Sequence, residues 1–127
     1  MKIYGVGTDI IKISRIKSSI KKISFIRRIF DEKEILRCKK QNKSASCFAK
    51  RFAAKEAFSK ALGTGVRKGI NLNEIVILND QNGKPFIKLL GKTKLKIEKK
   101  FKKKKFKISL SLSDEDDYAV AFVNITI

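Results

Sequence analysis

The stretch SCFAKRFAAKEAFSKALGTG, residues 46–65, decides the fold, because residues 46–62 carry the longest helical pattern in the chain. Alanine recurs at every fourth position, 49, 53, 57 and 61, so small side chains line one helical face and allow close packing against a neighbouring element. Gly63 predicts the end of the helix, because glycine readily adopts the left-handed conformation found there. We therefore expect one long central helix.

Other segments alternate between apolar and polar residues, as β-strands do. In the first of them, KIYGVGTD, two glycines indicate the close approach of another backbone or of a ligand. The turn sequence DQNG at residues 80–83 joins two later strands into a hairpin. The predicted strands cover residues 2–9, 74–78, 86–90, 108–112 and 118–127.

Further helices are predicted from apolar residues at helical spacing. Residues 14–30 carry an isoleucine stripe, and Ser14 is placed to cap this helix. Asp31 and Glu34 have the spacing of a capping box for a short helix that follows. Residues 93–105 are a helical segment dominated by lysine.

The order of these elements predicts the fold class. Helices and strands are mixed without regular βαβ alternation, which indicates an α+β fold with an antiparallel sheet and one long central helix. No internal repeat or linker divides residues 1–127, so we expect a single compact domain. A chain of 127 residues buries a modest core, and a site shared between subunits is plausible.

The composition limits the partners. The net charge is +19, which attracts acidic proteins, polyphosphorylated small molecules and RNA. The abundant Lys, Ile, Asn and Phe also have A/T-rich codons, so a biased genome would produce this charge without a functional cause. Cys38 and Cys47 match no zinc or redox spacing, and we expect reduced thiols in a cytoplasmic protein. We expect no membrane span and no secretory segment.

The chain contains no histidine, which excludes Ser-His-Asp and Cys-His catalysis and any histidine-bound metal. Two carboxylates stand out: Asp9 ends the first predicted strand, and Glu56 shares a helical face with Phe48 and Phe52. A carboxylate on an apolar face needs a partner. Glu56 has one in Lys60, one turn later, and the residues alone favour this simple ion pair. The other interpretation is that Asp9 and Glu56 share a Mg²⁺ ion, with Lys60 neutralising a phosphate.

Two stretches resemble the holo-acyl-carrier-protein synthase family, the short trimeric type of 4′-phosphopantetheinyl transferase. They are GVGTDIIKISRI at residues 5–16 and FAKRFAAKEAFSKALGTG at residues 48–65. DQNGKPFI at residues 80–87 and SLSDEDDYAVAFV at residues 111–123 are similar to later segments of the family. The resemblance therefore covers nearly the whole chain.

The resemblance implies a homotrimer of the phosphopantetheinyl transferase fold that binds coenzyme A in the clefts between subunits. The implied reaction is Mg²⁺-dependent transfer of 4′-phosphopantetheine from coenzyme A to a serine of an acyl carrier protein. The serine attacks the β-phosphate and adenosine 3′,5′-bisphosphate leaves. In this reaction Asp9 and Glu56 look like the Mg²⁺ ligands, and Lys60 looks like a contact to the coenzyme A phosphates.

The remaining residues implied by the resemblance lie beside the cofactor and on the docking surface. Gly63, Thr64 and Gly65 look like the loop beside coenzyme A, although from the residues alone they are an ordinary helix end. A basic helix is expected to dock the acidic carrier, and its residues are Arg15, Lys21, Lys22 and Arg28.

The chain departs from the family near its SLS segment, where many members have a histidine. Lys107 and Asp114 occupy that region here, so the general base is left open between a metal-bound water and a carboxylate of the carrier. The segment 93–105 is richer in lysine than is usual in the family, through compositional drift or as a rim for the adenosine 3′-phosphate. The role of the run 102–105 stays open.

Two other classes of protein fit the sequence less well than a transferase. A nucleic-acid-binding module usually has exposed aromatic residues or a known motif, but most of the nine phenylalanines here fall at core spacing. A non-catalytic oligomeric scaffold would not require Asp9 and Glu56 at their positions. We therefore expect a transferase that binds neither nucleic acid nor membranes.

Overall fold

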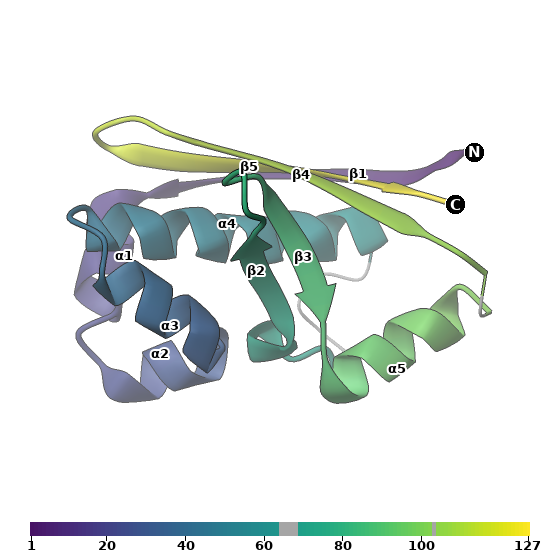
Figure 1. Cartoon of the computed structure of the whole chain (residues 1–127), viewed down its shortest axis with the longest axis horizontal. Coiled ribbons are helices and arrows are strands. Elements are labelled where there is room, and N and C mark those ends of the chain that lie inside the picture. Colours follow the sequence, from purple (N-terminus) through teal and green to yellow (C-terminus); the bar gives the residue numbers. More distant parts are fainter. Residues whose placement is uncertain (64–68, 103) are drawn as a thin grey trace.

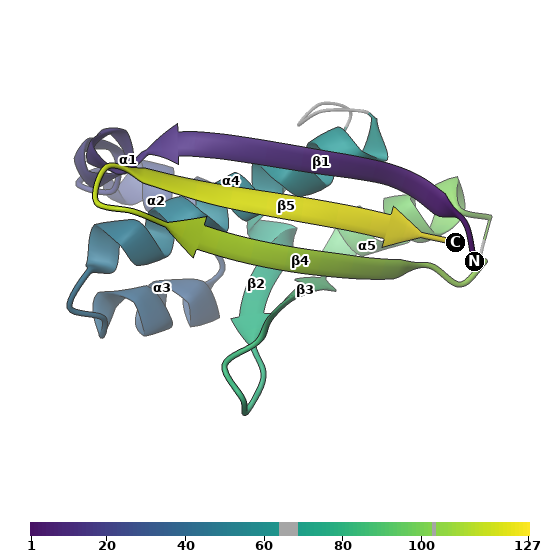
Figure 2. The same cartoon turned by 90° about the horizontal axis from the view of Figure 1, so that it is seen from above.

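The long helix predicted from the alanine repeat is α4 (Ser44–Leu62), and it lies along one face of a three-stranded antiparallel sheet (Figure 1). The computed structural model describes residues 1–63, 69–102 and 104–127. In this part of the chain the helices lie on one side of the sheet, and the opposite side carries none (Figure 2). The strands run in the order β1 (Ile3–Lys12), β5 (Tyr118–Thr126) and β4 (Lys107–Asp114).

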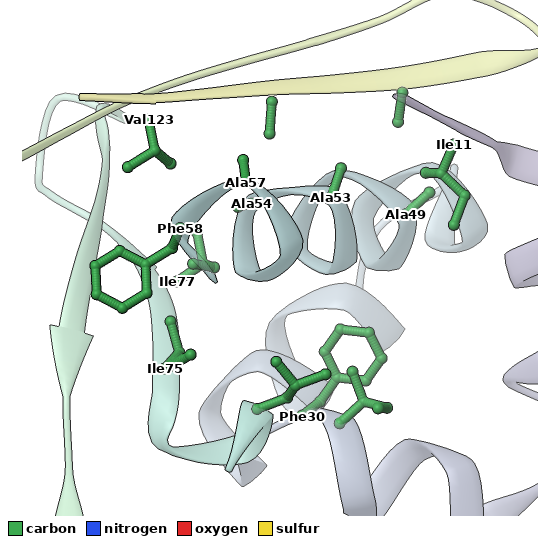
Figure 3. Close-up of a cluster of buried hydrophobic side chains, with 14 of the residues drawn as sticks. Ile11, Phe30, Ala49, Ala53, Ala54, Ala57, Phe58, Ile75, Ile77 and Val123 are labelled. Carbon is green, nitrogen blue, oxygen red and sulfur yellow. The ribbon is translucent and has the colours of Figure 1, made fainter. Parts of the chain in front are cut away.

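The sheet approaches α4 so closely that two strand positions have no room for a side chain. A Cβ atom on Gly5 would collide with the backbone carbonyl of Ala61, and one on Gly7 would collide with that of Ala57. On the helix side the contact is made by alanines, and Ala53 and Ala57 point toward the sheet (Figure 3). The close approach predicted from the glycines is therefore confirmed.

A two-stranded sheet packs on the other side of α4. It is the predicted hairpin of β2 (Ile75–Asn79) and β3 (Pro85–Leu89), and Ile77 pairs with Ile87 at its centre. A short 3-10 helix, η1 (Leu72–Glu74), leads into β2. The lysine-rich helix α5 (Gly91–Lys100) follows β3 and ends five residues before the predicted boundary. The α+β fold with antiparallel sheets and a long central helix is confirmed.

The single helix predicted over residues 14–30 is wrong, because the chain breaks into α1 (Ile13–Ser19) and α2 (Ile23–Ile29). The N-cap of α1 is Lys12, so Ser14 does not cap it. The turn between the two helices changes the direction of the chain. Ile16 of the first helix and Ile26 of the second are therefore both buried.

The next helix, α3 (Glu32–Lys39), begins as predicted. Asp31 accepts a hydrogen bond from the backbone N–H of Lys33, and Glu34 accepts one from the backbone N–H of Asp31. This reciprocal pair is the capping box predicted from the spacing of the two acids.

A lysine and a glutamate are fully buried together beneath α4. Lys55 Nζ donates to Glu34 Oε1 at 2.7 Å and to the carbonyl oxygens of Leu72 and Ile75 at 2.9 and 2.6 Å. Glu34 Oε2 accepts a hydrogen bond from the backbone N–H of Ile77. Burial raises the pKa of Glu34 and lowers the pKa of Lys55, while the attraction between the two opposes both shifts. The pair connects α3, α4 and β2 inside the core.

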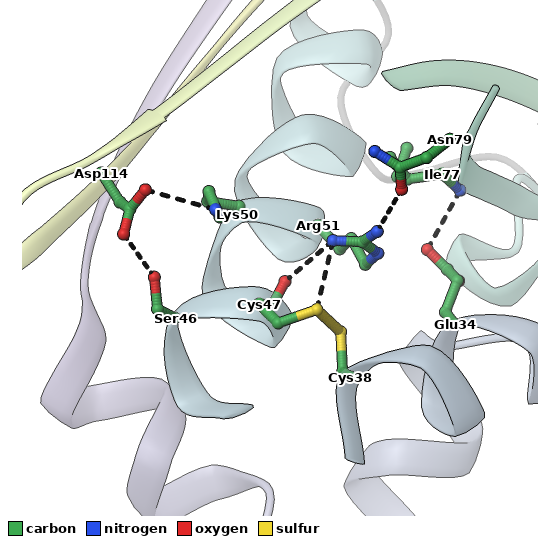
Figure 4. The surroundings of a disulfide bond; sticks show 9 residues. All are labelled: Glu34, Cys38, Ser46, Cys47, Lys50, Arg51, Ile77, Asn79 and Asp114. Carbon is green, nitrogen blue, oxygen red and sulfur yellow. Dashed lines mark hydrogen bonds and ion pairs between the residues drawn. A yellow bond between two sulfur atoms is a disulfide. The ribbon is translucent and has the colours of Figure 1, made fainter. Parts of the chain in front are cut away.

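The prediction of reduced thiols is wrong in this structure, because Cys38 and Cys47 form a disulfide (Figure 4). Their Cα atoms are 5.4 Å apart, within the range that a disulfide spans. The turn between α3 and α4 reverses the chain and brings the end of one helix against the start of the next. A sequence separation of nine therefore becomes a contact.

Candidate active site

Asp9 lies within β1 rather than at the end of a strand as predicted. The strand continues to Lys12 because β5 pairs with it along its whole remaining length, with Asp9 opposite Ala121 and Lys12 opposite Tyr118. Asp9 alternates with Gly7 and Ile11 and so belongs to the face of the sheet that packs on α4. Its side chain keeps 17% exposure at this edge.

Glu56 approaches Asp9 from α4. Partial burial raises the pKa of the Glu56 carboxyl, the negative charge of Asp9 raises it further, and Lys60 opposes these effects. The carboxylates of Asp9 and Glu56 therefore interact electrostatically within one chain.

Lys60, one turn after Glu56 on α4, reaches across to β1. Its Nζ lies 3.2 Å from Asp9 Oδ1 and donates to the carbonyl oxygen of Thr8 at 2.9 Å. The simple ion pair expected between Glu56 and Lys60 is therefore not formed, and the partner of the ammonium is Asp9. The Lys60 side chain is 55% exposed, so an anion from solvent can contact it.

These residues suit a magnesium ion, although the number of protein ligands is small. Among the described residues there is no group of three or more His, Cys, Asp or Glu side chains that could hold a metal. Mg²⁺ is commonly bound by one or two carboxylates, with waters and substrate phosphates completing its octahedron. Asp9 and Glu56 supply two hard oxygen ligands whose mutual repulsion a divalent cation relieves.

Only part of the predicted cofactor loop lies in the described chain. Gly63 ends α4 in the left-handed conformation, with φ of +83°, and donates its N–H to the carbonyl oxygen of Lys60 at 3.0 Å. The helix end predicted at this glycine is confirmed. Thr64 and Gly65 lie outside the described residues.

The four predicted docking residues are exposed but do not share one helix. Arg15 lies on α1, Lys21 and Lys22 form the turn after it, and Arg28 lies on α2. They therefore form a basic surface over two helices and their connection.

A second basic site, which the sequence reasoning missed, lies at the other end of α4. It is a pocket of about 570 Å³ between α3, the start of α4, the β2–β3 turn and the end of β4. Four of its lining residues are cations and one is an acid. These residues are Arg37, Lys43, Lys50, Arg51 and Asp114.

Arg51 lines this pocket and is buried, and its hydrogen bonds are drawn in Figure 4. Its Nη2 donates to Asn79 Oδ1 at 2.6 Å, and its Nη1 donates to the carbonyl oxygen and the sulfur of Cys47. Its Nε is buried and has no hydrogen-bond partner among the described residues. Burial lowers the pKa of Arg51, and the positive charge of nearby Arg37 lowers it further, whereas Glu34 raises it. An anion in the pocket would relieve this repulsion between two guanidinium groups.

Comparison with known proteins decides the family. The model of the 4′-phosphopantetheinyl transferase superfamily matches residues 5–123. A holo-[acyl-carrier-protein] synthase of Pelagibacter ubique is 48% identical over 97% of this chain and 96% of its own length. The chain belongs to this superfamily, as a holo-acyl-carrier-protein synthase.

Solved structures of holo-acyl-carrier-protein synthases agree with this assignment. The enzyme from Neisseria meningitidis has a TM-score of 0.86 and 40% identity over 99% of this chain and all of that one. The enzyme from Bacillus anthracis, solved in complex with CoA (3′,5′-ADP), has a TM-score of 0.78 and 34% identity over 97% of this chain and 96% of that one.

An ion-pair network surrounds Asp114, at the end of the SLS segment. Asp114 Oδ2 accepts a hydrogen bond from Ser46 Oγ at 2.7 Å, and Asp114 Oδ1 lies 3.2 Å from Lys50 Nζ (Figure 4). The hydrogen bond from Ser46 is the main cause of the lowered pKa of Asp114, and Lys50 adds to it. The carboxylate stays ionised and is a poor proton acceptor.

None of the helices in the described ranges is long and apolar enough to cross a membrane.

Proposed function

We propose that this synthase transfers 4′-phosphopantetheine from coenzyme A to a serine of an apo-acyl carrier protein in the cytoplasm, with Mg²⁺ bound by Asp9 and Glu56. The observation that carries the proposal is the convergence of two carboxylates and a lysine at the edge between β1 and α4. A bound Mg²⁺ would supply Lewis-acid stabilisation of the negative charge that develops on the pyrophosphate.

The residues of the chain would act mainly by positioning and by neutralising charge, as is usual in phosphoryl transfer. Lys60 would exchange its contact with Asp9 for a pyrophosphate oxygen, which its exposure and long side chain permit. The serine oxygen forms a bond to the β-phosphorus, and the bond from that phosphorus to the bridging oxygen breaks. Adenosine 3′,5′-bisphosphate carries the negative charge away, and the serine proton passes to a carboxylate or water because the chain has no histidine.

We infer that the Arg51 pocket holds the phosphorylated nucleotide end of coenzyme A. Its volume and its excess of cations suit an adenosine phosphate, and Arg51 and Arg37 are close enough to repel each other. Both this pocket and the Asp9–Glu56 edge include residues of α4, so we expect one long substrate to contact both, within a subunit or between subunits.

The synthase is proposed to act as a homotrimer, assembled through the helix-free face of the sheet. This face is apolar where a solvent-facing surface would be polar: Val6, Ile10 and Phe122 are 53%, 64% and 45% exposed. Light scattering that gives an active monomer at assay concentration would contradict the trimer.

Because the structure brings Asp9 and Glu56 together in one chain, mixed subunits should behave in a defined way. Inactive Asp9→Ala and Glu56→Ala chains should not restore activity when combined, since neither chain carries a complete pair.

Carrier docking is assigned to the basic surface over α1 and α2. Arg15→Glu should raise the KM for the acidic carrier about tenfold and leave the KM for coenzyme A nearly unchanged, because exposed charges mainly speed association. Rising salt should slow the wild type more than the variant. Lys105→Glu is the matched control, since this exposed lysine lies outside the proposed surface. If both charge reversals raise the KM for the carrier equally, the carrier is attracted by the overall charge of +19 and not by the proposed surface.

The direct test is to incubate the protein with apo-carrier, coenzyme A and Mg²⁺ and to follow the carrier by intact mass. We expect addition of one phosphopantetheine, its loss in excess EDTA and its recovery with added Mg²⁺. Absence of the addition would overturn the proposed activity. Undiminished addition in excess chelator would remove the metal from the mechanism.

A further inference from the structure

The disulfide lies in the wall of the Arg51 pocket rather than in a remote part of the fold. Cys47 lines the pocket, and its sulfur accepts a hydrogen bond from Arg51 Nη1 at 3.3 Å. Cys38, the other residue of the disulfide, lies in the last turn of α3. Between them runs the turn that carries Gln41, Asn42 and Lys43, and all three residues line the same pocket. The bond therefore holds both the turn and the guanidinium in place.

We propose that Cys38 and Cys47 are a reversible thiol–disulfide pair that controls how tightly the Arg51 pocket binds the nucleotide phosphate. The inference rests on the proposed function of that pocket. A disulfide in a cytoplasmic protein is usually transient, because glutathione and thioredoxin keep thiols reduced. The affinity of the pocket for the nucleotide phosphate would thus depend on the redox state of the compartment.

The oxidation needs a small-molecule disulfide as oxidant, such as glutathione disulfide. Cys47 is the entry point, because it is 6% exposed whereas Cys38 is fully buried, and because the adjacent guanidinium of Arg51 favours its thiolate. The Cys47 thiolate attacks one glutathione sulfur, which forms a mixed disulfide and releases one glutathione thiolate. Cys38 loses its proton and attacks Cys47 Sγ, which closes the protein disulfide and releases the second thiolate. Two electrons and two protons pass to two molecules of glutathione.

The two states differ in what Arg51 offers to a ligand. In the disulfide, the Cys47 sulfur is neutral and is a weak acceptor, so the guanidinium keeps its full charge for an anion. In the reduced state, a Cys47 thiolate would accept a charge-assisted hydrogen bond from Arg51 and neutralise it. The turn with Lys43 would also lose its link to α3. Oxidation should therefore tighten nucleotide binding.

The experiment compares one protein in two redox states, so no variant has to fold. Wild-type protein is oxidised with glutathione disulfide or reduced with a phosphine, and alkylation followed by intact mass counts the free thiols. The dissociation constant for adenosine 3′,5′-bisphosphate is then measured by calorimetry. We expect about tenfold tighter binding in the oxidised protein, the effect of one charge-assisted hydrogen bond.

The Cys38→Ser/Cys47→Ser double variant is the matched control and should bind equally under both conditions. Cys38→Ser alone keeps the Cys47 thiol beside Arg51 and should bind like the reduced protein under reducing conditions. With glutathione disulfide this variant should stop at the Cys47–glutathione mixed disulfide, which intact mass detects. Equal dissociation constants for oxidised and reduced wild type would overturn the proposal, as would two alkylated cysteines after treatment with glutathione disulfide. If the oxidised wild type transfers phosphopantetheine but shows no redox effect, this inference alone fails; if neither redox state transfers it, the proposed function fails.

Discussion

On α4, Lys55 lies in the core against α3 and η1, whereas Glu56, the next residue, lies beside Asp9 at the edge of β1. The Lys55 ammonium has a carboxylate and two carbonyl oxygens within 2.9 Å and the ring of Phe30 at 5.4 Å. No hydrogen bond or ion pair joins Glu56 to another residue in the described chain, and the negative charge of Asp9 repels the Glu56 carboxylate.

The difference separates a structural charge from a functional one. The Lys55 charge is saturated by the fold, so it has no capacity left for a ligand. The Glu56 charge is disfavoured by partial burial and by the charge of Asp9, and Lys60 offsets this only in part, which is typical of a functional site.

Lys55→Met should have the largest effect, because it leaves Glu34 buried without its counter-charge. We expect the free energy of unfolding to fall by about 3–5 kcal/mol. Urea denaturation followed by circular dichroism measures it. The double variant Lys55→Met/Glu34→Leu removes both charges and should recover part of the loss, since the backbone groups that the pair held still lose their hydrogen-bond partners. A single variant as stable as the wild type would show that the pair contributes nothing.

Glu56→Gln should leave the fold intact and remove function. We expect kcat/KM for transfer to fall by about 100-fold or more, since a neutral amide is a poor Mg²⁺ ligand. The free energy of unfolding should change by less than about 0.5 kcal/mol. Asp9→Ala should abolish transfer in the same way, and Glu32→Gln, an exposed change on α3, is the control. Loss of stability that matched the loss of activity would make Glu56 a structural residue like Lys55.

The raised pKa of Glu56 predicts that stability and metal affinity respond to pH in opposite directions. Because the folded pKa lies above the ordinary value, the contribution of Glu56 to stability is complete below pH 4.5 and is lost as pH rises through the folded pKa. The wild type should lose about 1 kcal/mol or less relative to Glu56→Gln over this interval. Mg²⁺ affinity, by calorimetry, should increase over the same interval. Parallel changes in both quantities would contradict the assignment of Glu56 as a ligand.

Ser46→Ala tests how much the partly buried Asp114 carboxylate contributes to the free energy of unfolding, and it should have the smallest effect. Ser46 holds the carboxylate of Asp114, which is 30% exposed and also pairs with Lys50. The pKa of Asp114 is lowered, so its stabilisation is present above the ordinary value and is lost as pH falls through the folded one. We expect a loss of about 0.5–1 kcal/mol at neutral pH and a smaller loss in acid. Thermal unfolding beside Ser18→Ala, an exposed control on α1, measures this loss, and a loss that does not depend on pH would contradict the prediction.

Local patterns predicted the elements whose cause is local. The alanine repeat of α4, the capping box at Asp31 and the closing Gly63 depend on residues within a few positions of each other. The two glycines of β1 indicated a close contact without naming its partner. The break between α1 and α2 was missed because the stripe of isoleucines continues across it, and only packing decides where each half is buried.

The candidate site was predicted in part, for a physical reason. Asp9 and Glu56 stood out because each is a carboxylate in apolar surroundings, but the residues alone favoured the ordinary pair of Glu56 with Lys60. Lys55 resembled a surface lysine, since its partner Glu34 is 21 positions away. The Arg51 pocket is assembled from residues of five elements, α3, α4, β2, β3 and β4, so no contiguous motif marks it.

The contact of Gly5 and Gly7 with the carbonyls of Ala61 and Ala57 has a genetic consequence. Most steric clashes in a core can be relieved when a neighbouring side chain is replaced by a smaller one. Here the clashing atoms belong to the peptide backbone, which no substitution makes smaller. A mutant carrying alanine at either glycine should yield true revertants and no second-site suppressors within α4. In a deep mutational library, these two positions should tolerate no other amino acid.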